Sequence, residues 1–211
     1  MIEPKFSITH WNQSWSKLGG TIPHPSIYEQ LIARYSEPHR SYHTLQHLEE
    51  CLEHLSNVRS LSSNSAEIEI SLWFHDAIYD PRQHDNEEQS ARWAVQVAQD
   101  LGLSPDIAER LRSLILATRH DAIPQTSNAK ILVDIDLAIL GASEERFDLY
   151  ETQVRQEYCW VPENEFCIAR RQILNRFLAR PVLYNTTYFQ ERFELQARAN
   201  LLRSIANLVL N

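Results

Sequence analysis

The residues best suited to chemistry are histidines and aspartates in three short segments of the chain. His43 and His47 are four residues apart, a spacing that places two imidazoles on one face of a helix. His75 and Asp76 are adjacent within an apolar stretch, and Asp136 lies among leucines and isoleucines. Imidazole nitrogens and carboxylate oxygens together bind hard or borderline divalent metals. The pattern therefore predicts a metal site that keeps open positions for water.

Taken singly, each segment also fits a structural role, such as a histidine pair on a solvated face or Asp76 paired with an arginine. A zinc protease of the HExxH kind is disfavoured, because Thr44 occupies the position of its glutamate. Asp134 and Asp136 project about 200° apart on a helix and cannot both face one site. Asp136 shares its face with apolar residues and is the predicted ligand, whereas Asp134 is expected in a partly solvated ion pair with Lys130.

Helical periodicity runs along almost the whole chain, without a convincing strand pattern. Pro38 closes a helix that begins at Ile27, and Asn86 is expected to cap the helix that follows a polar loop over 80–85. The sequence predicts one all-α domain over residues 1–211, a bundle of nine or ten helices. The longer predicted helices are Tyr42–Val58, Ala66–Tyr79, Ser104–Thr118, Asn128–Leu140 (stopped by Gly141), Glu144–Tyr158, Pro162–Ala179 and Thr187–Leu210.

Composition narrows the function classes. The chain has 211 residues with 28 acidic and 20 basic ones, a net charge of −8 that argues against a nucleic-acid surface. Only 4 glycines disfavour turn-rich sandwiches and glycine-rich phosphate loops. The cysteines (Cys51, Cys159 and Cys167) are too scattered for a disulfide framework and are expected to be reduced, buried thiols. With no signal peptide or membrane span in evidence, the cytoplasm is the expected location.

The ordered set of His47, His75, Asp76 and Asp136 resembles the HD superfamily of metal-dependent phosphohydrolases, named for its His-Asp doublet. Within it, residues 40–141 look like an uncharacterised bacterial branch of predicted phosphohydrolases, with the shared segments Trp73–Asp80, Asn86–Ala91 and Asp134–Gly141. Tyr42–His47 is also similar to a motif of cyclic nucleotide phosphodiesterases. Thr44 replaces an asparagine of that motif, and the nucleotide-binding C-terminal part of those enzymes has no counterpart, so cyclic nucleotide specificity is not expected.

The resemblance implies a role for each matched residue: His47, His75, Asp76 and Asp136 as metal ligands and His43 as the general acid. The metal would be manganese, magnesium, nickel, iron or zinc, as one ion or two. Three further residues each have two possible roles. Glu87 would orient the attacking water or support the first turn of its helix. His120 would bind a second metal or satisfy helix carbonyls, and Arg119 would bind a substrate phosphate or lie on the surface.

The expected activity is hydrolysis of a small phosphate ester or nucleotide. Two alternatives stay open at this stage: a nucleotide- or metal-binding sensor without turnover, and a di-iron oxygenase on the same scaffold. The helices over 144–211 either complete the bundle or form a homodimer face.

Overall fold

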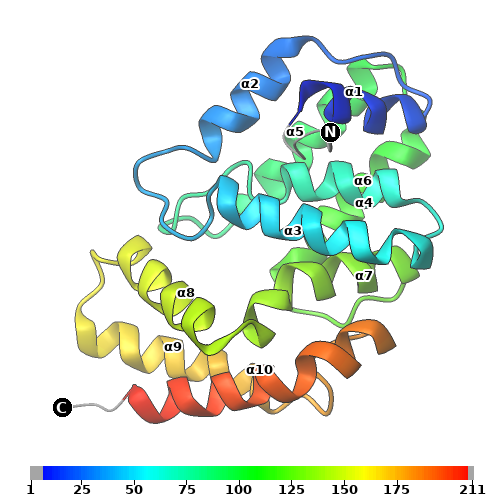
Figure 1. Cartoon of the computed structure of the whole chain (residues 1–211). Coiled ribbons are helices and arrows are strands. Elements are labelled where there is room, and N and C mark those ends of the chain that lie inside the picture. The colour runs from blue at the N-terminus through cyan, green and yellow to red at the C-terminus, as the bar shows by residue number, and fades with distance from the viewer. Residues whose placement is uncertain (1–6, 209–211) are drawn as a thin grey trace. The chain divides into compact units, whose positions relative to one another are not determined.

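The computed structural model describes residues 7–208 and is helical throughout (Figure 1). Those residues form ten α-helices and three short 3-10 helices and contain no strand, as the periodicity predicts. Among them, no helix combines the length and apolar character needed to cross a membrane. Contacts between Cα atoms divide the chain into two compact units, one ending at Ile135 and the other beginning at Asp136.

The first unit is built around one fully buried helix. It contains α1 (Ile8–Lys17), α2 (Pro25–Arg34), α3 (Leu45–Val58), η1 (Arg59–Leu61), α4 (Ser65–Phe74), α5 (Asn86–Asp100), α6 (Pro105–Leu116), η2 (Ala117–Arg119) and α7 (Ser127–Asp136). Every residue of α4 from Ala66 to Phe74 is buried, and α4 contacts α1, α3, α5 and α6. Its glutamates, Glu67 and Glu69, are each paired with an arginine, and most of its other residues are apolar. A helix of this kind belongs in the interior. Since α4 ends at a buried residue, Phe74, the turn that follows it starts inside the protein.

Aromatic side chains fill the space beside α4. Trp11 packs edge-on against Trp15 and Trp73, with ring centroids 5.5 and 5.2 Å apart, and Phe74 packs edge-on against Trp93 at 5.4 Å. All except Trp93 are fully buried. Such rings bury large areas and favour edge-to-face contact, so they fix α1 and α5 against α4.

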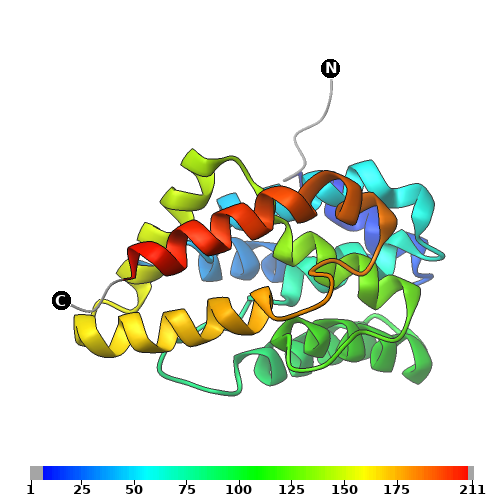
Figure 2. The ribbon, with the colours of Figure 1, turned by 90° about the horizontal axis from the view of Figure 1, so that it is seen from below.

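The second unit comprises η3 (Leu137–Gly141), α8 (Glu144–Glu157), α9 (Glu163–Leu178) and α10 (Thr187–Asn207). Helices α9 and α10 lie side by side (Figure 2), and α10 also packs on η3. A Cβ on Gly141 would lie 2.7 Å from both the Cβ and the carbonyl oxygen of Phe193. Glycine is needed there because the two backbones approach so closely.

Several predicted boundaries were wrong, and three of them affect the candidate site. Helix α3 begins at Leu45, so His43 precedes it, and α4 ends at Phe74, so His75 and Asp76 lie in the turn that follows. Helix α7 ends at Asp136 and continues as η3. Asn86 is the first residue of α5; instead of capping it, its side chain exchanges two hydrogen bonds with the backbone of Asp80.

At the C-terminus, α10 ends at Asn207, and the last residues of the predicted helix, 209 and 210, lie outside the described residues. The boundaries of the remaining predicted helices agree to within a few residues. Their caps follow ordinary rules. In α6, for example, the side chain of the N-cap residue Ser104 accepts a hydrogen bond from the Ile107 N–H, and Pro105 is the first residue of the helix.

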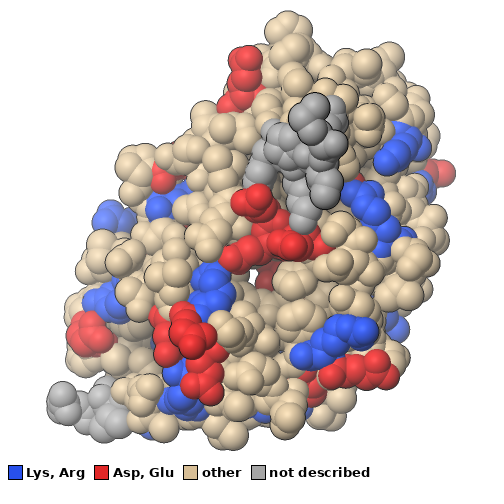
Figure 3. Space-filling model, viewed as in Figure 1, with Lys and Arg blue, Asp and Glu red and all other residues tan. Residues whose placement is uncertain are grey.

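Charged side chains on the face in Figure 3 lie in small groups, with lysines and arginines beside aspartates and glutamates. Ion pairs in the described part of the chain include Arg59 with Glu69 at 2.6 Å, Arg112 with Glu88 at 3.0 Å, and Arg198 with Glu194 at 2.8 Å. These guanidinium groups neutralise acids of the same chain.

Candidate metal centre

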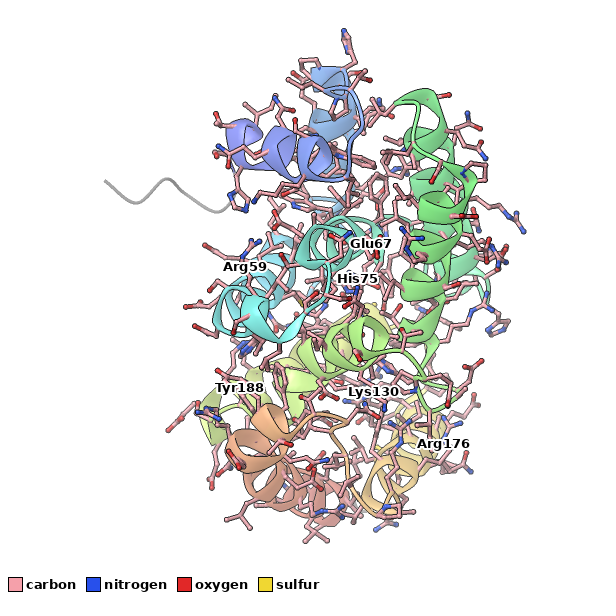
Figure 4. All side chains as sticks on the ribbon, turned by 90° about the vertical axis from the view of Figure 1, so that its right-hand side faces the viewer. Arg59, Glu67, His75, Lys130, Arg176 and Tyr188 are labelled. Atoms are coloured by element: carbon pink, nitrogen blue, oxygen red, sulfur yellow. The ribbon has the colours of Figure 1, made fainter. Side chains whose placement is uncertain are left out.

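The turn after α4 orients the predicted His-Asp doublet. His75 is 1% exposed, and its Nδ1 lies 2.8 Å from the carbonyl oxygen of Leu72, one turn earlier. Because a carbonyl only accepts, Nδ1 carries the proton, and in neutral His75 the lone pair is then on Nε2. Histidines that bind metals are commonly oriented by such a bond. His75 lies among the helices of the unit (Figure 4).

Helix α3 brings a second imidazole to the same point. His47 is 2% exposed, and its Nε2 lies 3.1 Å from Nε2 of His75. Asp76 Oδ2 lies 2.9 Å from Nε2 of His75 and 3.5 Å from Nε2 of His47. Two ligand atoms each about 2.0–2.1 Å from one ion are about 2.9 Å apart at a right angle and about 3.4 Å apart in a tetrahedron. The three atoms are therefore spaced as ligands of one ion.

The charge balance of this group also suits a cation. In the neutral tautomer, the Nε2 lone pair of His75 faces a carboxylate oxygen, and two acceptors this close need a proton or a metal ion between them. Burial alone would raise the pKa of Asp76, but His75, His43 and His47 hold that pKa well below its usual range. Asp76 is thus ionised at neutral pH and supplies a negative charge next to two imidazoles.

Cys51 is a ligand-type residue that the sequence interpretation treated only as a buried thiol. It lies four residues after His47 on the same face of α3, is 2% exposed, and places its Sγ 3.8 Å from both ring nitrogens of His47. His47, Cys51 and His75 belong to a buried group whose ligand atoms lie within 4.8 Å of one another and could hold a metal ion. The i, i+4 spacing of His47 and Cys51 was the signal for it.

His43 reaches the edge of this group from the turn before α3 rather than from the helix itself. The centroid of its ring is 5.9 Å from that of His47. The ring stacks on Tyr79, with 4.1 Å between the two centroids. Backbone geometry, not helical periodicity, therefore brings the two histidines near each other.

Arg40, which the sequence interpretation did not single out, holds this turn in place. Its Nη1 donates to the carbonyl oxygens of His43 at 3.1 Å and Asp76 at 2.7 Å, and its Nη2 donates to that of Ala77 at 3.2 Å. The residue is 6% exposed, and its guanidinium lies over the rings of Tyr35 and Tyr79. One buried side chain thus ties the segment of His43 to the segment of Asp76.

The expected burial of the two aspartates in α7 was the wrong way round. Asp134, expected to be partly solvated, is completely buried, and Asp136, expected in the interior, is half-buried. Asp136 is the last residue of α7 and the first of the second unit. Within that unit, burial raises the pKa of Tyr150, and the negative charge of Asp136 contributes to the shift.

The three residues weighed beyond the core set lie around the start of α5 and the end of η2. Glu87 is in the first turn of α5, 3.9 Å from Nε of Arg119, which also approaches Glu88 at 3.4 Å. His120 directly follows η2 and has a left-handed backbone conformation, with φ of 56°. None of the three belongs to the buried ligand group.

Compared with protein families, with curated proteins and with solved structures, the chain shows no match. The all-helical fold and the buried group of ligand-type side chains are compatible with an HD-type domain.

Proposed function

We propose that this protein is a metal-dependent phosphohydrolase that acts on a small phosphate ester or a nucleotide. One observation carries the proposal: two imidazole nitrogens and a carboxylate oxygen lie 2.9–3.5 Å apart beside a third, unburied histidine. The residue types and the order His47, His75-Asp76, Asp136 along the chain support the same interpretation, since they match the HD pattern.

In the proposed site, His47, His75 and Asp76 bind a divalent ion, and Asp136 is the fourth ligand on the strength of its place in the sequence pattern. When bound, such an ion lowers the pKa of a coordinated water and polarises phosphoryl oxygens. Asp76 supplies the negative charge that favours a cation. The Leu72 carbonyl binds Nδ1–H of His75, so the Nε2 lone pair of that ring faces Asp76.

His43 is the proposed proton donor to the leaving alkoxide. Its ring is held against Tyr79, and its backbone is held by Arg40, so the imidazole is positioned without being a member of the close-packed ligand group. General acids work best when positioned in this way, and histidine is the side chain that most often serves as one. The roles of Glu87, Arg119 and His120 remain those predicted from the sequence.

The first experiment counts metal ions per chain by elemental analysis in the wild type, Asp76→Ala and His43→Ala, each after incubation with manganese, nickel, iron or zinc. We expect one or two ions in the wild type and in His43→Ala, and none in Asp76→Ala. Metal-free wild-type protein under all four conditions contradicts the proposal. Loss of metal in His43→Ala makes that residue a ligand instead.

The second experiment measures phosphate release from mono-, cyclic and diphosphate substrates. His43→Ala should lose about 10²–10⁴-fold in turnover while keeping its metal. The matched control is His39→Ala, because His39 also stacks near Tyr79, at 6.4 Å, but is bonded through Nε2 to the Tyr79 carbonyl. Tight nucleotide binding without product supports the sensor alternative, and iron-dependent oxygen consumption supports the oxygenase.

A further inference from the structure

A pocket of about 820 Å³ lies in the first unit, away from the candidate metal centre. It is enclosed by the start of α4, the second half of α6 and the segment 121–129, which leads into α7. His43, His47, Cys51, His75 and Asp76 are not among its lining residues. Small-molecule sites in proteins typically have volumes of about 300–1,000 Å³, so this pocket has the size of a ligand site.

One side of the pocket is apolar. Leu114 and Ala117 of α6 and its 3-10 extension face Ile123 and Pro124 of the connecting segment. Ile123 is 75% exposed, an unusual position for a large aliphatic side chain at the edge of a pocket. An apolar ligand would remove this surface from water, a gain of about 25 cal/mol for each Å² buried.

The polar side contains one buried carboxylate with an open oxygen. Glu67 is 3% exposed and comes from α4, like the turn that carries His75 (Figure 4). Its Oε1 accepts a hydrogen bond from Nε of Arg110 at 2.9 Å and lies 2.8 Å from Nη2 of the same arginine in an ion pair. Among the described residues, its Oε2 accepts none. Because Glu67 lines the pocket and Arg110 approaches only Oε1, Oε2 is an acceptor that a donor on a bound molecule can use.

The remaining charges favour a cationic donor over an anion. The lining contains two acids, Glu67 and Asp121, against one base, Arg110, which is already bound to Glu67. Two helix N-termini also reach the pocket, but side chains cap both. Asn64 Oδ1 accepts from Glu67 N–H at 3.4 Å, and Thr126 Oγ1 accepts from Ala129 N–H at 3.2 Å. Capped N-termini have fewer free N–H groups for an anion.

From these features we infer that the pocket binds a small apolar molecule carrying a protonated amine. The ammonium donates to Oε2 of Glu67, and the hydrocarbon part packs on Leu114, Ala117 and Ile123. This inference is independent of the proposed hydrolase activity, because it uses none of the residues assigned to the metal centre.

Calorimetric titration with three probes of one shape tests the inference: 2-phenylethylamine, 2-phenylethanol and 3-phenylpropionate at neutral pH. We expect saturable binding of the amine, at least about 10-fold weaker binding of the alcohol, and no binding of the carboxylate. Equal affinities for amine and carboxylate, or no saturable binding of the amine, overturn the inference.

Variants locate the binding. Glu67→Gln should weaken amine binding at least about 10-fold, whereas Glu109→Gln, the same charge change at an exposed position of α6, should leave it unchanged. Ala117→Trp fills the pocket while keeping Glu67, so it should abolish binding even if Glu67→Gln does not fold. Asp76→Ala should bind the amine like the wild type. Equal weakening in both glutamate variants means that only net charge attracts the probe, which refutes the site.

Discussion

Replacing Arg40 by alanine tests whether one buried guanidinium positions the candidate metal centre. The substitution leaves three backbone carbonyls, those of His43, Asp76 and Ala77, without their charged donor. Each such loss costs about 1–3 kcal/mol. Because water can reach part of the opened space, we take the lower half of that range, about 1–2 kcal/mol for each carbonyl, and expect the free energy of unfolding to fall by about 3–6 kcal/mol. Domains of this size are typically stable by about 5–15 kcal/mol, so we expect a folded variant with a much smaller margin of stability.

The same substitution should loosen the centre itself. The carbonyl of Asp76 takes the shortest of the three bonds, 2.7 Å, so its loss frees the backbone next to the ligand-type carboxylate. Mutating groups that orient metal ligands typically lowers affinity about 10–100-fold, and we expect that loss here. Arg40→Lys should recover only part of both effects, since a single ammonium does not reproduce the fork that spans three carbonyls.

Urea unfolding of the metal-free protein measures the stability change, and competition with a chelator measures zinc or manganese affinity. The control is Arg34→Ala: Arg34 is half exposed and pairs with Glu37 at 3.0 Å, as Arg40 does at 3.1 Å. An exposed pair contributes about 0–1 kcal/mol, so this variant should behave like the wild type. If the free energy of unfolding falls by less than about 1 kcal/mol in Arg40→Ala, the three carbonyl hydrogen bonds do not stabilise the fold as argued. Unchanged metal affinity in a destabilised Arg40→Ala shows that Arg40 supports only the fold.

Three further outcomes are expected. Burial raises the pKa of Tyr35 to about 12, so the unfolded chain loses this proton first, near pH 10. The free energy of unfolding should therefore fall by about 2–3 kcal/mol between pH 10 and 12 through this group, and Tyr35→Phe, followed by urea unfolding across that range, should lack the loss. Gly141→Ala should lower stability by about 1–3 kcal/mol, because its Cβ meets Phe193; an unchanged melting temperature would contradict the close approach. Cys51→Ala should keep its metal, because His47 already has an oxygen and a nitrogen neighbour at ligand spacing; elemental analysis showing an empty site would make the thiol a ligand.

Much of this architecture follows from local pattern. Breakers such as Pro38 and the Ser104-Pro105 pair, together with helical periodicity, were sufficient to predict an all-α bundle of nine or ten helices, and residues 7–208 form ten. The strongly apolar segment before His75 indicated a buried helix, and α4 is one in spite of its two glutamates. These features are visible in sequence because capping, proline geometry and amphipathic spacing act over only a few residues.

The same local rules failed where distant segments meet. From periodicity, the predicted helices include His43 and His75-Asp76. In the structure, α3 begins only at Leu45 and α4 ends at Phe74. There, the carbonyls that a continuing helix would have used accept hydrogen bonds from Arg40, and Ser90 bonds to the backbone of Ile78. The turn after α4 depends on partners 12 to 37 residues away, which no short window contains.

The sequence by itself determined which residue types are available: two imidazoles and an adjacent carboxylate on apolar segments, in an order that resembles HD phosphohydrolases. Only the tertiary structure decided that Nε2 of His47, Nε2 of His75 and Oδ2 of Asp76 converge within 3.5 Å. It also decided that Cys51 joins them, that Arg40 fastens the turn, and that Asp134 rather than Asp136 is fully buried. The reason is that spacing along a helix sets only the direction of a side chain, whereas convergence and burial depend on which other helices pack against that face.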